Sequence, residues 1–404
     1  MNKKLLALTF SLALLLVGCS NSTGSSDTIT FWAYEPTSTS RKDELNSLIQ
    51  DFEQQHDVKV ETTYIPKEEF ATKLNSSIAV SKNPDVAYLD QTLIAMNAED
   101  NTLLDLTEFI ENSSDLSLDD YFQGALETNY YEGKIYGLPL SMSTVAMYYN
   151  KDLVPTPPTT WEEWVNIAKE VYVPNEVAAF SGIGDGGWAA WLLPAFIHNA
   201  GGSMMNADNT EVKFADQPGI DAMNLIKELI SYSDQSIRSS QNAFGNGLVA
   251  FDITGVWEID VYRASFPDLN FGVALIPSKD GVDSYSNIGG DNIVIFDNTK
   301  NPDLSFEFIK HLTTAESSLV MADVTGNFPA HVEAAQNPKY TGDEHLNVFM
   351  KQLEHAVARP TLTKWYKVND EVLGKAIDSI LISGSDVEAT MKDAANKATQ
   401  ILFE

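Results

Sequence analysis

The chain has 404 residues, and its 57 acidic side chains against 26 basic ones give a formal net charge of −31 at pH 7. This acidity argues against binding to nucleic acid or to another polyanion, because both would be repelled. The length exceeds what one hydrophobic core usually organises, so the sequence predicts two domains.

The first segment has the pattern of an export signal. Lys3 and Lys4 precede an apolar run over 5–17, which is shorter than the roughly 20 residues that a membrane-spanning helix needs. The run ends at Cys19, the only cysteine of the chain, as in a bacterial lipoprotein-processing site. We therefore expect residues 1–18 to be a signal peptide, Cys19 to carry the lipid, and residues 19–27 to form a tether. The alternative interpretation of Cys19 is a buried free thiol.

After the tether, short β-rich runs alternate with amphipathic helical patterns. In chain order, strand, helix, strand, helix and strand are predicted over 28–33, 40–52, 58–65, 70–78 and 85–89. Ser40 and Asp43 are expected to cap the first helix. Such units form parallel sheets, which bind ligands beyond the carboxyl ends of their strands. Two of those ends carry the segment 32–35 and the pair Asp90 and Gln91.

The rest of the chain contains more helices than strands. Helices are predicted over 160–171, 188–199 and 219–231, and extended stretches over 271–276 and 288–296. Thr160, with Glu163 three residues later, is expected to cap its helix, and Trp161 and Trp164 to lie in the core. Near the carboxyl end, Gly384 is expected to separate two final helices.

Residues 182–187 formally match the dinucleotide-binding pattern G-x-G-x-x-G. The apolar run before the pattern is short, and the helix after it opens with Trp188, which is too bulky for the close packing that the motif needs. The sequence therefore disfavours a dinucleotide site.

Four segments together resemble the extracellular sugar-binding proteins of ABC importers, the maltose and multiple-sugar-binding family. They are Gly137-Leu138-Pro139 leading into Tyr148 to Leu153, Phe244 to Gly247 with Gly255-Val256-Trp257, Gly289-Gly290-Asp291-Asn292, and Arg359-Pro360 with Trp365. The resemblance implies an α/β fold of two domains, periplasmic-binding-protein-like type II, with the ligand in a cleft and hinge crossovers between the domains. The implied domains are residues 27–139 plus 288–314, and residues 140–287 plus 315–404.

The implied function is capture of a sugar or oligosaccharide and its delivery to a transmembrane ABC permease driven by separate ATPase subunits. The protein would be a monomer on the extracellular face of the cytoplasmic membrane, held only by its lipid. It would not be an enzyme, would bind no nucleic acid and would need no cofactor. The six histidines are dispersed, so no catalytic metal is expected.

A sugar site needs hydrogen-bonding groups for hydroxyls and aromatic faces for C–H patches. Predicted strand ends, helix starts and the segments of the resemblance supply these side chains. The candidate ligand-binding residues are Trp32, Tyr34, Glu35, Asp90, Gln91, Ser141, Ser143, Asp185, Trp188, Trp257, Glu258, Gly290, Asp291 and Tyr366. Trp191 fits the core as well as it fits a site.

Two alternatives stay open at this point. A receptor with the same transport role could bind a polyol or a glycerophosphodiester, although clustered basic residues for a phosphate are not evident. A secreted glycoside hydrolase would also use acids and aromatic residues in a cleft. The order of helices and strands does not give the eight repeats of a barrel, which disfavours the hydrolase.

Overall fold

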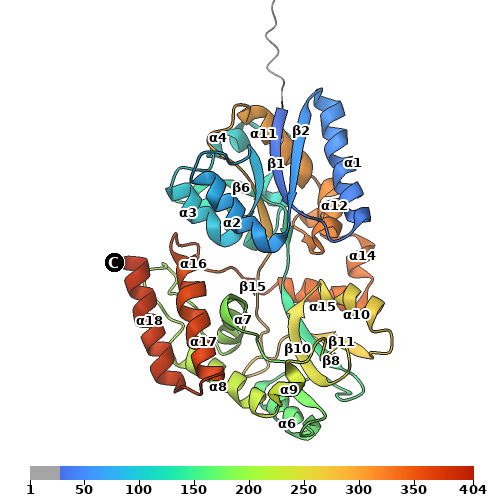
Figure 1. The fold of residues 1–404 in the computed structure, drawn as a ribbon, viewed down its shortest axis with the longest axis vertical. Helices are drawn as coiled ribbons and strands as arrows, with labels where there is room; N and C mark the ends of the chain where they lie inside the picture. Colours follow the sequence, from blue (N-terminus) through green and yellow to red (C-terminus); the bar gives the residue numbers. More distant parts are fainter. Residues whose placement is uncertain (1–27) are drawn as a thin grey trace, which may run out of the picture.

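The computed structural model describes residues 28–404. The predicted signal peptide, the lipid site at Cys19 and the tether lie outside the described residues. The described chain forms two α/β lobes, one above the other in Figure 1, and each lobe has its own sheet.

The first lobe is built on a five-stranded sheet of order β2-β1-β3-β13-β6. Its strands are β1 (Thr28–Tyr34), β2 (Lys59–Ile65), β3 (Val86–Asp90), β6 (Gly137–Pro139) and β13 (Asp291–Ile295). The predicted parallel arrangement is confirmed for β1, β2 and β3. β13 returns from the far half of the chain and runs antiparallel to both β3 and β6.

Helices cover the first sheet. They are α1 (Thr39–His56), α2 (Lys67–Ile78), α3 (Ile94–Glu99), α4 (Thr107–Asn112), α5 (Gln123–Glu127), α11 (Pro302–Thr313) and α12 (Ala315–Thr325). Fully buried Phe31, Phe52 and Phe308 pack edge to face or tilted in the core between β1, α1 and α11. The expected cap at Ser40 is wrong, because Ser38 accepts the hydrogen bond from the Arg41 backbone and the helix begins before Ser40.

The second lobe is built on a four-stranded sheet of order β11-β8-β10-β9. Its strands are β8 (Val145–Asn150), β9 (Ala178–Phe180), β10 (Val249–Gly255) and β11 (Phe271–Ala274). The main helices are α6 (Trp161–Val171), α7 (Gly186–Asn199), α8 (Gln217–Ser231), α9 (Gln235–Arg238), α10 (Glu258–Ser265), α15 (Glu344–Leu353), α17 (Gly374–Leu381) and α18 (Val387–Phe403). The predicted cap of α6 is confirmed as a capping box between Thr160 and Glu163, and Trp161 and Trp164 are buried as expected.

Short elements complete the lobes and the connections between them. The strands are β4 (Tyr130–Tyr131), β5 (Lys134–Ile135), β7 (Ser141–Met142), β12 (Ser286–Asn287), β14 (Phe328–Pro329) and β15 (Ala356–Val357). The helices are η1 (Gln91–Leu93), η2 (Leu118–Asp120), α13 (Val332–Ala335), α14 (Pro338–Thr341), α16 (Trp365–Lys367) and the π-helical turn η3 (Val368–Leu373). Parallel pairing of β12 with β15 and antiparallel pairing of β7 with β14 bring distant segments together near the junction.

The junction is the place where the chain passes between the lobes. After β12, Gly289 bridges to Ser143 through two backbone hydrogen bonds of 2.8 Å, and the chain then enters β13. α12 follows α11 and packs against α1. The sequence assigns α12 to the second domain with residues 315–404, and the exact division into domains stays a prediction.

No helix within residues 28–404 is long and apolar enough to cross a membrane.

Candidate functional site

The site begins at one edge of the first sheet, where two carboxylates are neighbours. Asp90 is the last residue of β3, and Asp291 is the first residue of β13. Because the two strands are antiparallel, these two ends meet, and Asp291 lies opposite Asp90 in the register. Tyr34, the last residue of β1, ends at the same edge.

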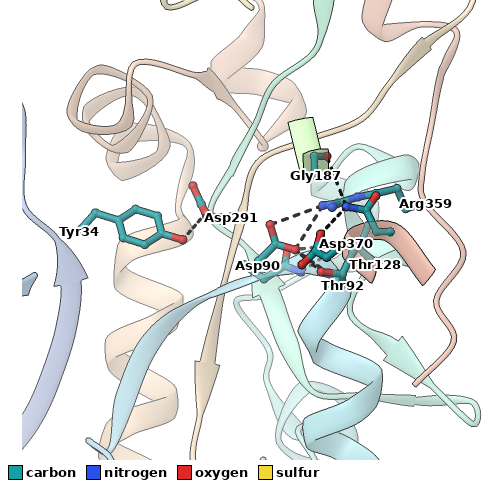
Figure 2. A network of polar contacts seen from close by, with 10 residues as sticks. Tyr34, Asp90, Thr92, Thr128, Gly187, Asp291, Arg359 and Asp370 are labelled. Carbon is teal, nitrogen blue, oxygen red and sulfur yellow. Dashed lines mark hydrogen bonds and ion pairs between the residues drawn. The ribbon is translucent and has the colours of Figure 1, made fainter. Parts of the chain in front are cut away.

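Asp90 is held in its charged form. Its carboxylate accepts hydrogen bonds from the Thr92 backbone N–H (2.9 Å) and the Thr92 hydroxyl (2.5 Å), and it pairs with the Arg359 guanidinium at 3.2 Å (Figure 2). Burial alone would raise the pKa of Asp90, but the charge of Arg359 and the bonds from Thr92 outweigh it and lower the pKa below its usual value. Asp90 is therefore an acceptor whose charge is compensated.

Asp291 has the opposite environment. The Tyr34 hydroxyl donates a hydrogen bond of 2.9 Å to its carboxylate, and Figure 2 shows the Tyr34 ring pointing at this group. Burial raises the pKa of Asp291 and the nearby Asp90 adds to this, although Lys67 and the bond from Tyr34 act against it. Burial and both carboxylates also raise the pKa of Tyr34, so its hydroxyl keeps its proton.

Three tryptophans from the second lobe form an aromatic wall, which we define as Trp188, Trp191 and Trp257. Trp188 and Trp191 lie one turn apart on α7, and their rings stack with centroids 4.9 Å apart. Trp257 immediately precedes α10, and its ring meets that of Trp188 edge to face at 6.1 Å. Trp188 is 40% exposed although it belongs to a large aromatic cluster, so part of its face is free for contact.

The carboxylates and the aromatic wall line one cavity of about 430 Å³, the central pocket. The lining residues are Lys67, Asp90, Ser143, Trp188, Trp191, Trp257, Gly289, Gly290, Asp291, Thr325, Asn327 and Arg359. A side pocket of about 380 Å³ shares Lys67, Asp90 and Arg359 with it and extends towards Tyr34, Tyr366, Asn369 and Asp370. Residues from both lobes therefore line two neighbouring pockets that share charged side chains.

The structure brings together many of the candidate residues of the sequence. Those that line the central or side pocket are Tyr34, Asp90, Ser143, Trp188, Trp257, Gly290, Asp291 and Tyr366. Whether they contact a ligand stays a prediction.

The other candidates lie outside the lining of these two pockets. On the first lobe, Trp32 is half-buried on β1, Glu35 is exposed with Lys42 at 4.0 Å, and Gln91 is buried behind Asp90. On the segments near the junction and the second lobe, buried Ser141 accepts a hydrogen bond from Asn327, Asp185 is exposed before α7, and Glu258 opens α10.

Six residues that line the central pocket were absent from the sequence-based set: Lys67, Trp191, Gly289, Thr325, Asn327 and Arg359. Lys67 opens α2, a helix that was predicted only from residue 70 onward. Thr325 ends α12 and Asn327 follows it, and the sequence there has no pattern that marks a site. Arg359 belongs to a segment of the resemblance. Arginine is also scarce in this chain, with only four residues, and this could have drawn attention to Arg359.

A larger hollow of about 620 Å³ lies between α4 and α11, away from this site. Its charged lining consists of Glu108, Asp115, Asp303, Glu307 and the single Lys310, which pairs with Asp115 at 2.8 Å and with Glu307 at 3.0 Å. Its aromatic lining is limited to Phe109 and Phe306, whose tilted rings have centroids 5.3 Å apart, and it contains no tryptophan, so its size does not make it the better candidate.

The chemistry of the central pocket suits a neutral ligand rich in hydroxyls. Carboxylate, ammonium, guanidinium and amide groups can take hydroxyls as donors and acceptors, and the tryptophan faces can cover C–H surface. The two cations Lys67 and Arg359 are balanced by Asp90 and Asp291, so no net charge is offered to an ionic ligand. Among residues 28–404 there is no group of three or more side chains that could hold a metal ion.

Comparison with known proteins places this geometry in context. The family model described as bacterial extracellular solute-binding protein matches residues 47–348. A maltotriose-binding protein of Pyrococcus abyssi is 29% identical over 353 residues, which are 82% of this chain and 74% of the relative. A maltooligosaccharide ABC transporter solute-binding lipoprotein of Streptococcus pneumoniae is 27% identical over 295 residues, 67% of this chain and 66% of the relative.

Solved structures agree in the fold. The cyclic α-maltosyl-1,6-maltose binding protein of Arthrobacter globiformis superposes with a TM-score of 0.80 at 23% identity, and the match covers 93% of this chain and 98% of that one. At this level of identity the likeness shows the fold alone. It confirms the predicted two-domain α/β architecture of type II.

Proposed function

The chain belongs to the bacterial extracellular solute-binding proteins, and from this premise we propose that it captures a neutral sugar or oligosaccharide and delivers it to an ABC permease. The observation that carries the proposal is the central pocket, where the aromatic wall of one lobe lines the same cavity as Asp90 and Asp291 of the other. The relatives named for maltotriose and maltooligosaccharides support the ligand class. Transport energy would come from separate ATPase subunits.

The proposal extends to the place where the protein works. A lipid on Cys19 would hold a monomer at the extracellular face of the cytoplasmic membrane, with residues 20–27 as the tether. The lipoprotein relative from Streptococcus pneumoniae supports this anchor. No catalytic step is required, because a receptor only has to bind, close and release.

Thermal unfolding of the chain without residues 1–19 tests the ligand class. The panel contains monosaccharides, linear oligosaccharides, polyols and glycerophosphodiesters. A ligand at 100 times its dissociation constant adds about 2.7 kcal/mol to the free energy of unfolding, so its midpoint shift is measurable. A shift with saccharides alone is expected, whereas a shift only with polyols or glycerophosphodiesters would keep the receptor and change its ligand.

The matched variant for this experiment is Trp257→Ala. Loss of the indole face is expected to weaken saccharide binding at least about tenfold, or about 1.4 kcal/mol, while the protein stays folded. Phe403→Ala is the control, because Phe403 is also a partly exposed aromatic (44%) but lies at the end of α18. Equal affinities for wild type and a folded Trp257→Ala protein would remove the central pocket as the site.

One observation favours a second candidate, a glycoside hydrolase. Asp90 and Asp291 are neighbours with pKa values shifted in opposite directions, and acid–base catalysis on a glycosidic bond uses such a pair. Both carboxylates, however, already have fixed partners in Arg359 and Tyr34. Prolonged incubation with oligosaccharides is expected to release no new reducing ends, and their release in wild type but not in Asp291→Asn would establish the enzyme.

A further inference from the structure

A third cavity adjoins the central pocket on the other side of Trp257. This far pocket has a volume of about 430 Å³ and lies where α1 and α12 approach α10, α14 and α15. These helices lie on one side of the junction between the two lobes, at the right in Figure 1. Trp257, Thr325 and Asn327 line both the central and the far pocket, so the two spaces share one wall.

The Trp257 ring is fixed in this shared wall. It folds back over Gly255, where an added Cβ would come within 2.1 Å of the ring. On the other side it meets the edge of Trp188. A ligand that covers the aromatic wall therefore lies against the same ring that lines the far pocket.

The wall of the far pocket includes a tyrosine whose buried hydroxyl is unpaired within the described residues. Tyr340, which lines it, is only 2% exposed, and its hydroxyl has no hydrogen-bond partner within residues 28–404. The ring is fixed by packing against Phe328, with centroids 5.5 Å apart. A buried hydroxyl without a partner costs free energy, so a ligand hydroxyl that reached it after a local shift of the lining would stabilise the complex.

The remaining lining suits a saccharide better than an ion. Arg41 of the first lobe lies 3.9 Å from Asp260 of the second, and Lys339 pairs with Asp323, so both cations are compensated. These pairs present donors and acceptors side by side. Val261 (43% exposed) and the Trp257 ring add apolar surface for C–H patches.

We propose that the far pocket is a second saccharide compartment, and that the ligand is an oligosaccharide whose chain runs from the central pocket past Trp257 to Tyr340. This inference rests on the proposed function of the central pocket. It adds that affinity depends on chain length and that residues of α10 and α14 set this dependence.

Binding of graded linear oligosaccharides tests the proposal. Calorimetry would compare malto-, cello- and manno-oligosaccharides from the disaccharide to the hexasaccharide with wild type, Val261→Trp and Tyr340→Phe. Val261→Trp fills the compartment from its exposed rim, and Val282→Trp is the control, because Val282 is an exposed valine (76%) outside the lining of all three pockets. Tyr340→Phe removes only the hydroxyl.

The expected result is that wild type gains affinity with chain length, that Val261→Trp loses at least about tenfold for the longer members only, and that Val282→Trp behaves as wild type. Tyr340→Phe is expected to lose about fivefold for the same members. Equal affinity of wild type and Val261→Trp for every chain length would overturn the compartment and leave the proposed function standing. If wild type binds no saccharide at all, the proposed function and this inference fail together.

Discussion

Asp90 and Asp291 occupy facing positions in one strand pair, yet the surroundings stabilise the charged form of Asp90 more than that of Asp291. Asp90 receives a guanidinium and two hydrogen bonds, whereas Asp291 receives one hydroxyl and lies beside another carboxylate. One side chain therefore serves as a permanent anionic acceptor, and the other is the more easily protonated. Hydroxyls of a sugar can use both, since each accepts and donates.

The lowered pKa of Asp90 predicts a specific pH dependence of stability. A carboxyl group whose pKa is lower in the folded than in the unfolded state stabilises the protein above its unfolded pKa of about 3.9, and this contribution is lost as the pH falls through the folded pKa. Asp90→Asn should therefore reduce the free energy of unfolding by about 0.5–1 kcal/mol at pH 7, because the carboxylate is 44% exposed and its ion pair is partly screened.

The difference between wild type and Asp90→Asn should shrink as the pH falls below about 4, when wild type also loses the charge. Urea unfolding at several pH values measures it, with Asp51→Asn as the control on the exposed face of α1. A difference that stays constant down to pH 2, or that grows, would contradict the assigned role of Arg359.

Single residues of the site differ in how far sequence could predict them. Asp90 and Asp291 could be predicted as site residues because a strand end and a pair of glycines mark them. Trp257 could be predicted because its turn belongs to the resemblance. The proximity of Asp90 and Asp291 could not be predicted, since it depends on β13 running antiparallel beside β3. Lys67 and Asn327 have no local signal, because their place in the pocket comes only from how α2 and α12 are set relative to the second lobe.

At the scale of elements, the crossing from β12 to β13 is the most constrained segment. Gly290 has φ +125°, and an added Cβ would lie 2.2 Å from the Ser141 carbonyl oxygen and 2.7 Å from the Met142 Cα. The backbone of β7 therefore packs directly on this glycine. In the sequence the two glycines stand out only as part of a segment of the resemblance, and the structure shows that neighbouring backbone fills the space beside Gly290.

Gly290→Ala is expected to reduce the free energy of unfolding by about 2–4 kcal/mol, from backbone strain together with the overlap with β7. Gly133→Ala is the matched control, since Gly133 also has positive φ (+78°) but has no atom within 4 Å of the added Cβ. Strain alone should cost the control about 1 kcal/mol. Chemical denaturation measures the free energy of unfolding of both variants. Similar reductions in the two would show that the backbone of β7 shifts to make room for the added Cβ.

Elements with strong local patterns were predictable, and those that depend on tertiary contacts were not. The helix after Thr160 follows from its capping box and its apolar face. The predicted start of α1 differs from the observed one because several hydroxyl residues precede the helix. Only the structure shows that Ser38 is the one that accepts the capping hydrogen bond. The π-helical turn before α17 has no sequence signal, although it places Asn369 and Asp370 at the side pocket.

At the scale of the whole molecule, the central pocket exists only because two lobes meet. Its carboxylates belong to the first sheet and its tryptophans to the second lobe, so a ligand bound to both favours the state in which they are close. Ion pairs that join the lobes include Arg41 with Asp260 at 3.9 Å and Arg359 with Asp90 at 3.2 Å, and both are partly exposed. Pairs of this kind are weak, so the unliganded lobes should separate readily.

Solution X-ray scattering should therefore show that ligand compacts the protein. A compact chain of this length has a radius of gyration of about 21 Å, and the unliganded protein should exceed this value because open conformations are populated. A saturating saccharide chosen from the thermal panel should lower the radius of gyration, and it can do so only to the extent that it binds the closed state more tightly. Trp257→Ala at the same ligand concentration should keep the larger value, which separates closure from an effect of the added sugar on the solvent. If the radius of gyration of wild type stays constant at full saturation, the two lobes form a preformed cleft, and the permease would have to recognise the ligand itself or a local change at the rim.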